Sequence, residues 1–173
     1  MGRPLAGWLL AAFAVVMLGL AWGEFSRTSR KNGTGMTSRT TPAPIARWHV
    51  ILAAKDAKAL DDLLADDVVF QSPAVHSPQK GKVLAGAYLR AAMKVLGNPT
   101  FRYLEEWYED RSAVLEFELT IDGIVINGVD IVHWNDEGRI VNFKVMLRPL
   151  KALNTIVPLM AAELEALKNG APT

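Results

Sequence analysis

A single carboxylate opens an otherwise apolar stretch late in the chain. Asp130 begins this stretch within the segment "VDIVHWNDEGRI", Val129 to Ile140, which passes through the turn-forming residues 135–138. An aspartic acid held among apolar side chains keeps its proton to unusually high pH, and it can then donate a hydrogen bond or act as an acid. The direction in which Asp130 points therefore decides its chemistry.

The residues around Asp130 predict that it points inward. Asp122-Gly123 lies between two alternating runs and is typical of a two-residue β-hairpin turn. Such a turn places Leu115 opposite Asp130, and directly opposed residues project to the same side of a sheet. The side that carries Asp130 is otherwise apolar: Leu115, Phe117, Leu119, Ile126, Gly128, Val132 and Trp134. Because an apolar face packs into the core, the carboxyl group is expected there too.

Composition narrows the chemistry further. The chain has no cysteine, which excludes disulfides, thiolate ligands and cysteine nucleophiles. Its three histidines form no His-x-x-x-His pair, and we find no phosphate-binding glycine loop or Gly-x-Ser-x-Gly motif, so neither a metal nor a cofactor is expected. With 19 basic and 18 acidic residues the chain lacks the concentrated positive charge of a nucleic-acid-binding protein, and no nucleic-acid partner is expected.

The periodicity of the chain predicts an α+β domain. Helical patterns cover about residues 42–56, 57–64 and 81–97, with one short strand over 66–72; strands follow over about 100–109, 112–121, 124–134 and 139–148, and an amphipathic helix and tail over 151–173. Helices followed by antiparallel strands are typical of helices packed on one face of a sheet. The last helix fits equally over the outer sheet face, a pocket mouth or a second subunit.

The N-terminal region contains a hydrophobic segment over residues 1–23, with no charge from Pro4 to Gly23. This run is about long enough to span a bilayer as a helix. Three origins fit it: an anchor, a signal peptide cleaved after a small-x-small site, or a translation start at Met36 that removes it. We expect a protein anchored to the membrane by a single helix, through residues 4–23 alone, or a cytoplasmic protein if translation starts at Met36. Residues 24–41 have the composition of a polar linker.

Two segments carry a resemblance to a known family. "RWHVILAAKDAKALDDLLADDVVFQSPAVHSPQKGK" and "GVDIVHWNDEGRIVNFKVMLRP" resemble the SnoaL-like family of the nuclear transport factor 2-like superfamily over residues 42–150. The resemblance implies a cone of three N-terminal helices and a curved antiparallel sheet around a pocket. Members include ketosteroid isomerases, polyketide cyclases, scytalone dehydratase and limonene-epoxide hydrolase, alongside proteins without catalytic activity, so the fold alone does not assign a reaction.

The ketosteroid isomerases allow a comparison residue by residue. Their first-helix tyrosine, an oxyanion donor, falls on Trp48, and their oxyanion-hole aspartic acid falls on Asp130. Their catalytic base falls on Ser72, in "QSP". Trp48 can still donate through its indole N–H, whereas Ser72 cannot abstract a carbon-bound proton unaided. The resemblance therefore implies an acid without its usual base.

The remaining expectations concern the pocket and its partners. His76, in the loop after the first strand, is a candidate replacement base because its ordinary pKa of about 6.5 suits that task. The predicted pocket residues are Trp48, Phe70, Ser72, Tyr88, Phe117, Val132, Trp134, Phe143, Val145 and Leu147. The expected ligand is a small apolar molecule. It would be bound by an acid/base isomerase, cyclase, dehydratase or epoxide hydrolase, or by a non-catalytic binding or assembly module.

A homodimer is also predicted. Its interface would include the outer sheet face, with Val125, Val129 and Ile131, and the C-terminal helix.

Overall fold

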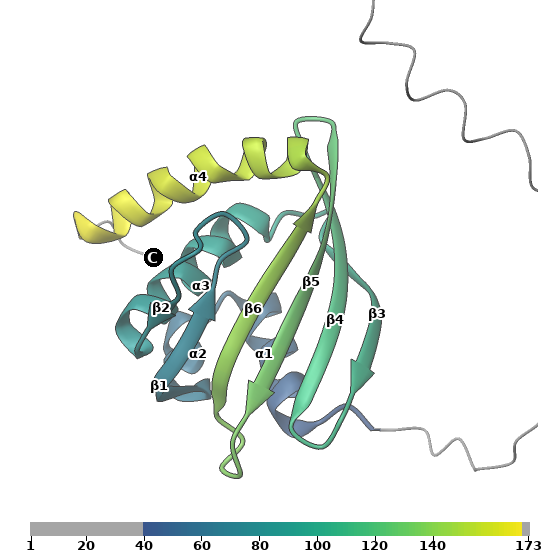
Figure 1. The fold of residues 1–173 in the computed structure, drawn as a ribbon, viewed down its shortest axis with the longest axis vertical. Helices are drawn as coiled ribbons and strands as arrows, with labels where there is room; N and C mark the ends of the chain where they lie inside the picture. The colour runs from purple at the N-terminus through teal and green to yellow at the C-terminus, as the bar shows by residue number, and fades with distance from the viewer. Residues whose placement is uncertain (1–39, 171–173) are drawn as a thin grey trace, which may run out of the picture. The chain divides into compact units, whose positions relative to one another are not determined.

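The computed structural model describes residues 40–170. The elements, in chain order, are α1 (Ala43–Ala54), α2 (Ala57–Leu63), β1 (Leu64–Gln71), β2 (Gln79–Lys80), α3 (Lys82–Leu96), β3 (Arg102–Tyr108), β4 (Ser112–Ile121), β5 (Ile124–Trp134), β6 (Ile140–Arg148) and α4 (Leu150–Lys168). The six strands form one twisted sheet in the order β2-β1-β6-β5-β4-β3 (Figure 1). The predicted α+β class is confirmed, and most predicted boundaries lie within about two residues of the observed ones.

Two details of the predicted architecture need correction. Only α1 and α2 precede the sheet, because the third predicted helix, α3, lies between β2 and β3. The sheet is also mixed, since β1 pairs with β6 in parallel while the other strand pairs are antiparallel. Parallel neighbours need a long connection, and here every element from β2 to β5 lies between the two strands in the chain. No local pattern in the sequence reports such a distant pairing.

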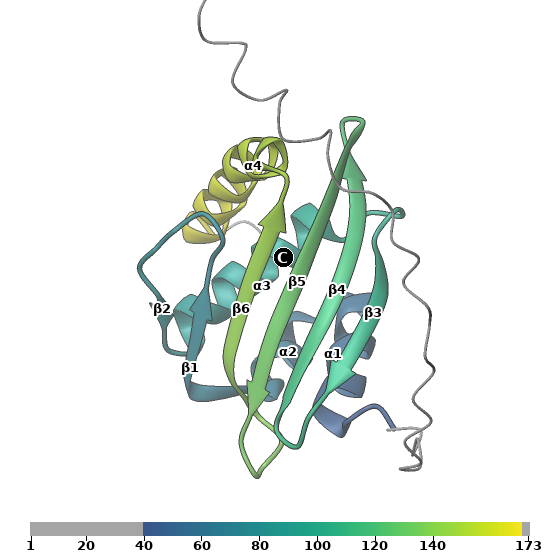
Figure 2. The ribbon, with the colours of Figure 1, turned by 45° about the vertical axis from the view of Figure 1, so that its right-hand side comes forward.

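Short-range signals place the helices. Asp56 caps α2 by accepting a hydrogen bond from the backbone N–H of Ala59 at 2.9 Å. Just before it, Lys55 adopts the left-handed conformation, with φ 53°, and so ends α1. The apolar faces of α1, α2 and α3 then meet one face of the sheet, where Ile45, Leu60 and Leu89 join the buried core (Figure 2). The core is therefore built between the helices and the strand face that carries Asp130.

The predicted hairpin register is confirmed. Ile121 pairs with Ile124 and Leu115 pairs with Asp130. The two turn residues, Asp122 and Gly123, both have positive φ, at 50° and 74°, as a type I′ turn requires. All of the side chains predicted to share the inner face with Asp130 are buried. A single turn thus fixes the orientation of every side chain on both strands.

Gly128 makes room for an aromatic ring on the inner face. It pairs with Phe117 across the β4–β5 ladder. A Cβ atom at this position would lie 2.2 Å from Cζ of Phe117 and 2.6 Å from Cδ2 of Leu147. The absence of a side chain lets the Phe117 ring lie across β5, two residues from Asp130.

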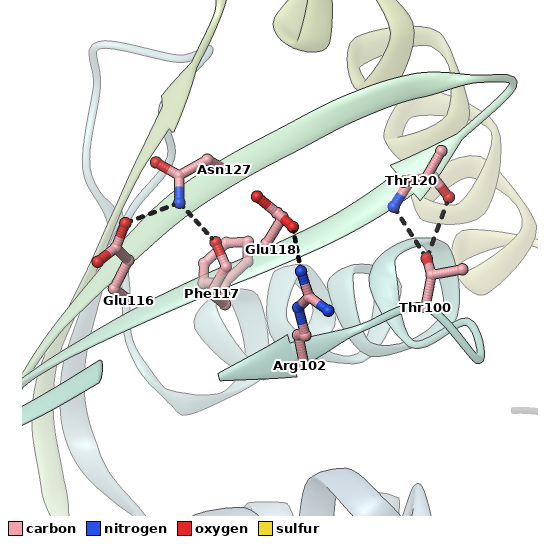
Figure 3. A network of polar contacts seen from close by, with 7 residues as sticks. All are labelled: Thr100, Arg102, Glu116, Phe117, Glu118, Thr120 and Asn127. Atoms are coloured by element: carbon pink, nitrogen blue, oxygen red, sulfur yellow. Dashed lines mark hydrogen bonds and ion pairs between the residues drawn. The ribbon is translucent and has the colours of Figure 1, made fainter. Parts of the chain in front are cut away.

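The opposite face of the sheet is held by polar contacts. Asn127, which is buried, donates to Glu116 Oε1 at 2.9 Å and accepts from Nε of Arg148 at 2.6 Å, so it links β4, β5 and β6. Arg102 of β3 pairs with Glu118 of β4 at 2.7 Å (Figure 3). The sheet therefore separates an apolar inner face from a polar outer face.

The C-terminal helix packs on the pocket side of the molecule. α4 contacts α3 and the end of β6, and it buries Ala152 and Ile156 (Figures 1 and 2). Lys94 of α3 pairs with Glu163 of α4 at 2.8 Å and fixes the two helices to each other. Of the places that the sequence left open, α4 takes the side of the predicted pocket and does not cover the outer sheet face, while its contact with a second subunit stays a prediction.

The expected membrane localisation also needs correction. No helix within residues 40–170 is both long enough and apolar enough to cross a membrane. α4, with 19 residues, is long enough but carries charges such as Lys151, Glu163 and Lys168. The apolar run over residues 4–23, on which the transmembrane helix was predicted, lies outside the described residues.

Candidate functional site

Asp130 lies on β5 and lines a cavity of about 40 Å³. Only 6% of the residue is exposed. The cavity is lined by three residues with polar side chains, Trp48, Tyr103 and Asp130, and by apolar ones: Leu52, Phe70, Leu89, Ala92, Met93, Leu96, Gly97, Phe101, Phe117, Phe143 and Val145. An isolated polar corner inside an apolar cavity is the usual form of a small-molecule site.

The polar corner is a chain of hydrogen bonds. Trp48 Nε1 donates to the hydroxyl oxygen of Tyr103 at 2.7 Å. The Tyr103 hydroxyl in turn donates to Oδ2 of Asp130 across a long 3.4 Å. The Trp48 ring is packed against Phe143, with centroids 5.0 Å apart, which holds its N–H in this direction. Three elements, α1, β3 and β5, therefore converge on one carboxyl group.

Burial dominates the electrostatics of this corner. Loss of water raises the pKa of Asp130 to about 8, and the hydrogen bond from Tyr103 opposes this only in part. Burial, and next the nearby Asp130 carboxylate, raise the pKa of Tyr103 well above its usual 10.0. At neutral pH the site therefore holds a largely protonated acid beside a protonated phenol.

Tyr103 is the functional residue that the sequence analysis missed. A two-residue turn at Asp110-Arg111, continued without interruption, would place Leu104 opposite Phe117 and turn Tyr103 to the outer face. The structure instead has a bulge at Leu104, so that Tyr103 pairs with Phe117 and points inward. A bulge of one residue reverses the two faces of a strand. Because of the bulge, Leu104 does not enter the core and is 42% exposed.

A second polar group lies directly behind Tyr103. The His49 ring lies 5.1 Å from the Tyr103 ring, and its Nε2 is 3.1 Å from Oε1 of Glu106. Glu106 lies opposite Leu115 and also accepts a short hydrogen bond from Tyr108. His49 is half-buried and supports the wall of the site.

The structure gathers most of the predicted pocket residues around two neighbouring cavities. Trp48, Phe70, Phe117, Phe143 and Val145 line the inner cavity with Asp130; Phe70, Ser72, Tyr88, Val145 and Leu147 line an outer cavity of about 200 Å³. Val132 and Trp134 share the inner strand face and are buried, but they line neither cavity. His76 is exposed and lines neither cavity, so the structure does not bring it to Asp130.

The position of the expected base is distinct from the polar corner. The Ser72 hydroxyl oxygen accepts from the backbone N–H of Ala74 at 3.2 Å and lines the outer cavity only. In the inner cavity, Asp130 and Tyr103 are the titratable side chains. Within residues 40–170, His, Asp and Glu side chains form no group of three that could hold a metal ion. The chemistry that the described site offers is hydrogen-bond donation and proton donation.

The fold and the site together define an α+β domain that encloses an apolar cavity around a buried carboxylic acid. The SnoaL-like domain family matches residues 45–143, and the chain belongs to this family of the NTF2-like superfamily. The predicted family membership is thereby confirmed.

Solved structures agree with this assignment. A steroid delta-isomerase from Pseudomonas aeruginosa is similar with 32% identity and a TM-score of 0.68, over 73% of this chain and 93% of that chain. A protein from Silicibacter pomeroyi with a cystatin-like fold is similar with 29% identity and a TM-score of 0.66, over 73% of this chain and 91% of that chain. No curated protein matches the chain.

The raised pKa of Asp130 predicts a specific pH dependence of stability. The folded pKa of about 8 exceeds the ordinary 3.8, so between these values the folded state holds a proton that the unfolded state releases. The free energy of unfolding should therefore decrease as the pH rises from about 4 to about 8, by up to about 1.4 kcal/mol per pH unit, and level off above that range. Urea denaturation of wild type and Asp130→Asn at each pH isolates this contribution, because other groups cancel in the difference. Parallel pH profiles for the two proteins would contradict the assignment.

Proposed function

We propose that this protein binds a small, mostly apolar molecule and donates a hydrogen bond from Asp130 or Tyr103 to an oxygen of that molecule. The proposal rests on the number of O–H groups in the polar corner that lack an acceptor. The protonated Asp130 and Tyr103 have one O–H each, and their mutual bond at 3.4 Å uses only one of them. Trp48 already donates to Tyr103, so one O–H remains for an acceptor in the cavity. A ligand oxygen at this point would satisfy it.

The same donors would favour acid chemistry on a carbonyl or an epoxide. Charge that develops on the ligand oxygen would be stabilised by hydrogen bonds fixed in place before the reaction, in an environment with little water. The similarity to a steroid delta-isomerase at 32% identity supports this form of the proposal. Isomerisation, cyclisation, dehydration and epoxide hydration could each draw on an acid at this position.

One observation favours binding without turnover as the second candidate. Ser72 occupies the position of the expected base, and its hydroxyl lines the outer cavity, away from the polar corner. His76 stays a prediction as a replacement base. It follows Ala74 and Val75, which line the outer cavity, so it would act beside that cavity and away from the polar corner. A non-catalytic small-ligand-binding protein needs Asp130 but no base.

The binding of 2-naphthol to the full chain tests the role of Asp130. Its hydroxyl oxygen can accept from the polar corner, and its rings suit an apolar cavity. We expect Asp130→Leu to fold at least as stably as wild type, because an apolar residue packs there at lower cost. Its affinity for 2-naphthol should decrease by about tenfold, the value of one good hydrogen bond. Thermal melting and calorimetric titration measure the two effects.

A matched variant controls for the loss of a carboxylate. Asp67 is exposed, and Asp67→Asn should bind 2-naphthol like wild type. Equal affinities of wild type and Asp130→Leu for 2-naphthol would refute the proposed site.

A turnover assay separates the two candidate functions. It measures, by ultraviolet absorbance, the conversion of a β,γ-unsaturated ketone to its conjugated isomer. Turnover that is lost in Asp130→Asn supports the enzyme, and binding without turnover supports the second candidate.

We also propose that the chain forms a homodimer through the outer face of the sheet. Val125 and Met146 are 53% and 56% exposed there, and the partly exposed Val129 lies directly beside Met146. Apolar side chains grouped among charged ones on an exposed sheet face are typical of an interface. Light scattering should report about twice the monomer mass, and Met146→Glu should shift the protein to monomer. A wild-type monomer at micromolar concentration would exclude this interface.

A further inference from the structure

The outer cavity is a second, larger chamber between α4 and the strand ends. It has a volume of about 200 Å³, against about 40 Å³ for the inner cavity. Val157, Met160 and Leu164 of α4 form one wall, and the segment 72–75 after β1 forms another. α4 holds this position through its buried residue Ile156 and its ion pair with α3. The chamber is therefore a defined part of the fold.

A thin layer of side chains separates the two chambers. Phe70, Ala92, Leu96 and Val145 line both of them. The Phe70 ring contacts Tyr88 on the outer side, with centroids 5.6 Å apart, and Phe143 on the inner side, with centroids 6.2 Å apart. A rotation of side chains in this layer would join the chambers into one passage that leads from the molecular surface to Asp130.

The chemistry of the outer chamber suits hydrocarbon. Of its lining side chains, only Ser72 and Tyr88 carry polar atoms, and none is charged. The Ser72 oxygen already accepts from Ala74. A charged or strongly polar group placed in this chamber would lose its hydration without compensation. The inner chamber, by contrast, has space for only a few water molecules, so a ligand that reaches Asp130 must extend beyond it.

We infer that the ligand is an elongated hydrophobic ketone, phenol or alcohol that occupies both chambers. Its single oxygen reaches the polar corner, and its apolar end lies against α4 in the outer chamber. The part between them crosses the layer of side chains that separates the two chambers. The inner half of this arrangement rests on the proposed function. The outer half assigns to α4 a role in selecting ligands by the length of their hydrocarbon portion.

A series of 4-alkylphenols, from 4-methylphenol to 4-heptylphenol, tests the inference on the full chain by calorimetric titration. Each methylene that enters the outer chamber should strengthen binding about fourfold, until the chamber is filled. Ala161→Phe places a ring in this chamber and should abolish the gain per methylene. Ala162→Phe is the matched control, because the neighbouring Ala162 lines a different depression with Leu159 and Glu163 and should keep the gain.

The outcomes separate this inference from the proposed function. Val157→Asp, at a half-exposed lining position, should also reduce the gain per methylene, and it serves if Ala161→Phe fails to fold. If affinity in wild type does not rise with alkyl chain length, or if it rises equally in both lining variants, the ligand does not occupy the outer chamber. Asp130-dependent binding of 4-methylphenol would still support the proposed function. A steep series whose affinities do not change in Asp130→Asn would retain the outer chamber and remove the proposed function instead.

Discussion

The burial of one carboxyl group on the apolar face of a sheet is the constraint on which the site depends. Asp130 could be replaced by an apolar residue with a gain in packing, so its presence costs stability at neutral pH. The surrounding fold compensates in part. Trp48 fixes the Tyr103 hydroxyl, and Tyr103 gives Asp130 a hydrogen-bond partner. Within the described residues, no cation contacts Asp130, and the acid therefore stays protonated instead of becoming half of an ion pair.

Several irregular features of the sheet serve this corner. The bulge at Leu104 turns Tyr103 inward, and Gly128 leaves room for the ring of Phe117 beside the cavity. On the other face, Asn127 ties three strands together, so the irregular inner side is backed by a continuous network. Each feature weakens the regular pattern of a strand, and each has a direct consequence for the shape or chemistry of the cavity.

The parts of this site that could be predicted from the sequence are those fixed by local rules. The turn at Asp122-Gly123 sets the register of β4 and β5, and with it the inward direction of Asp130. Tyr103 could not be placed, because a one-residue bulge reverses the strand faces without a clear mark in the sequence. The parallel pairing of β1 with β6 joins residues far apart in the chain, and no local pattern specifies it. Amphipathicity predicted α4 but could not say which surface it covers, since an apolar stripe fits any apolar partner.

Asp130 is a neutral acid in the folded protein at neutral pH, and its titration tests this most directly. Carbon-13 NMR can follow the carboxyl groups of the aspartates through a pH series, with Asp130→Asn identifying the signal of interest. We predict that this signal changes with a pKa of about 8, far from the ordinary 3.8. A signal that titrates near its ordinary value would show that Asp130 is ionised at neutral pH, and it would contradict a site built around a protonated acid.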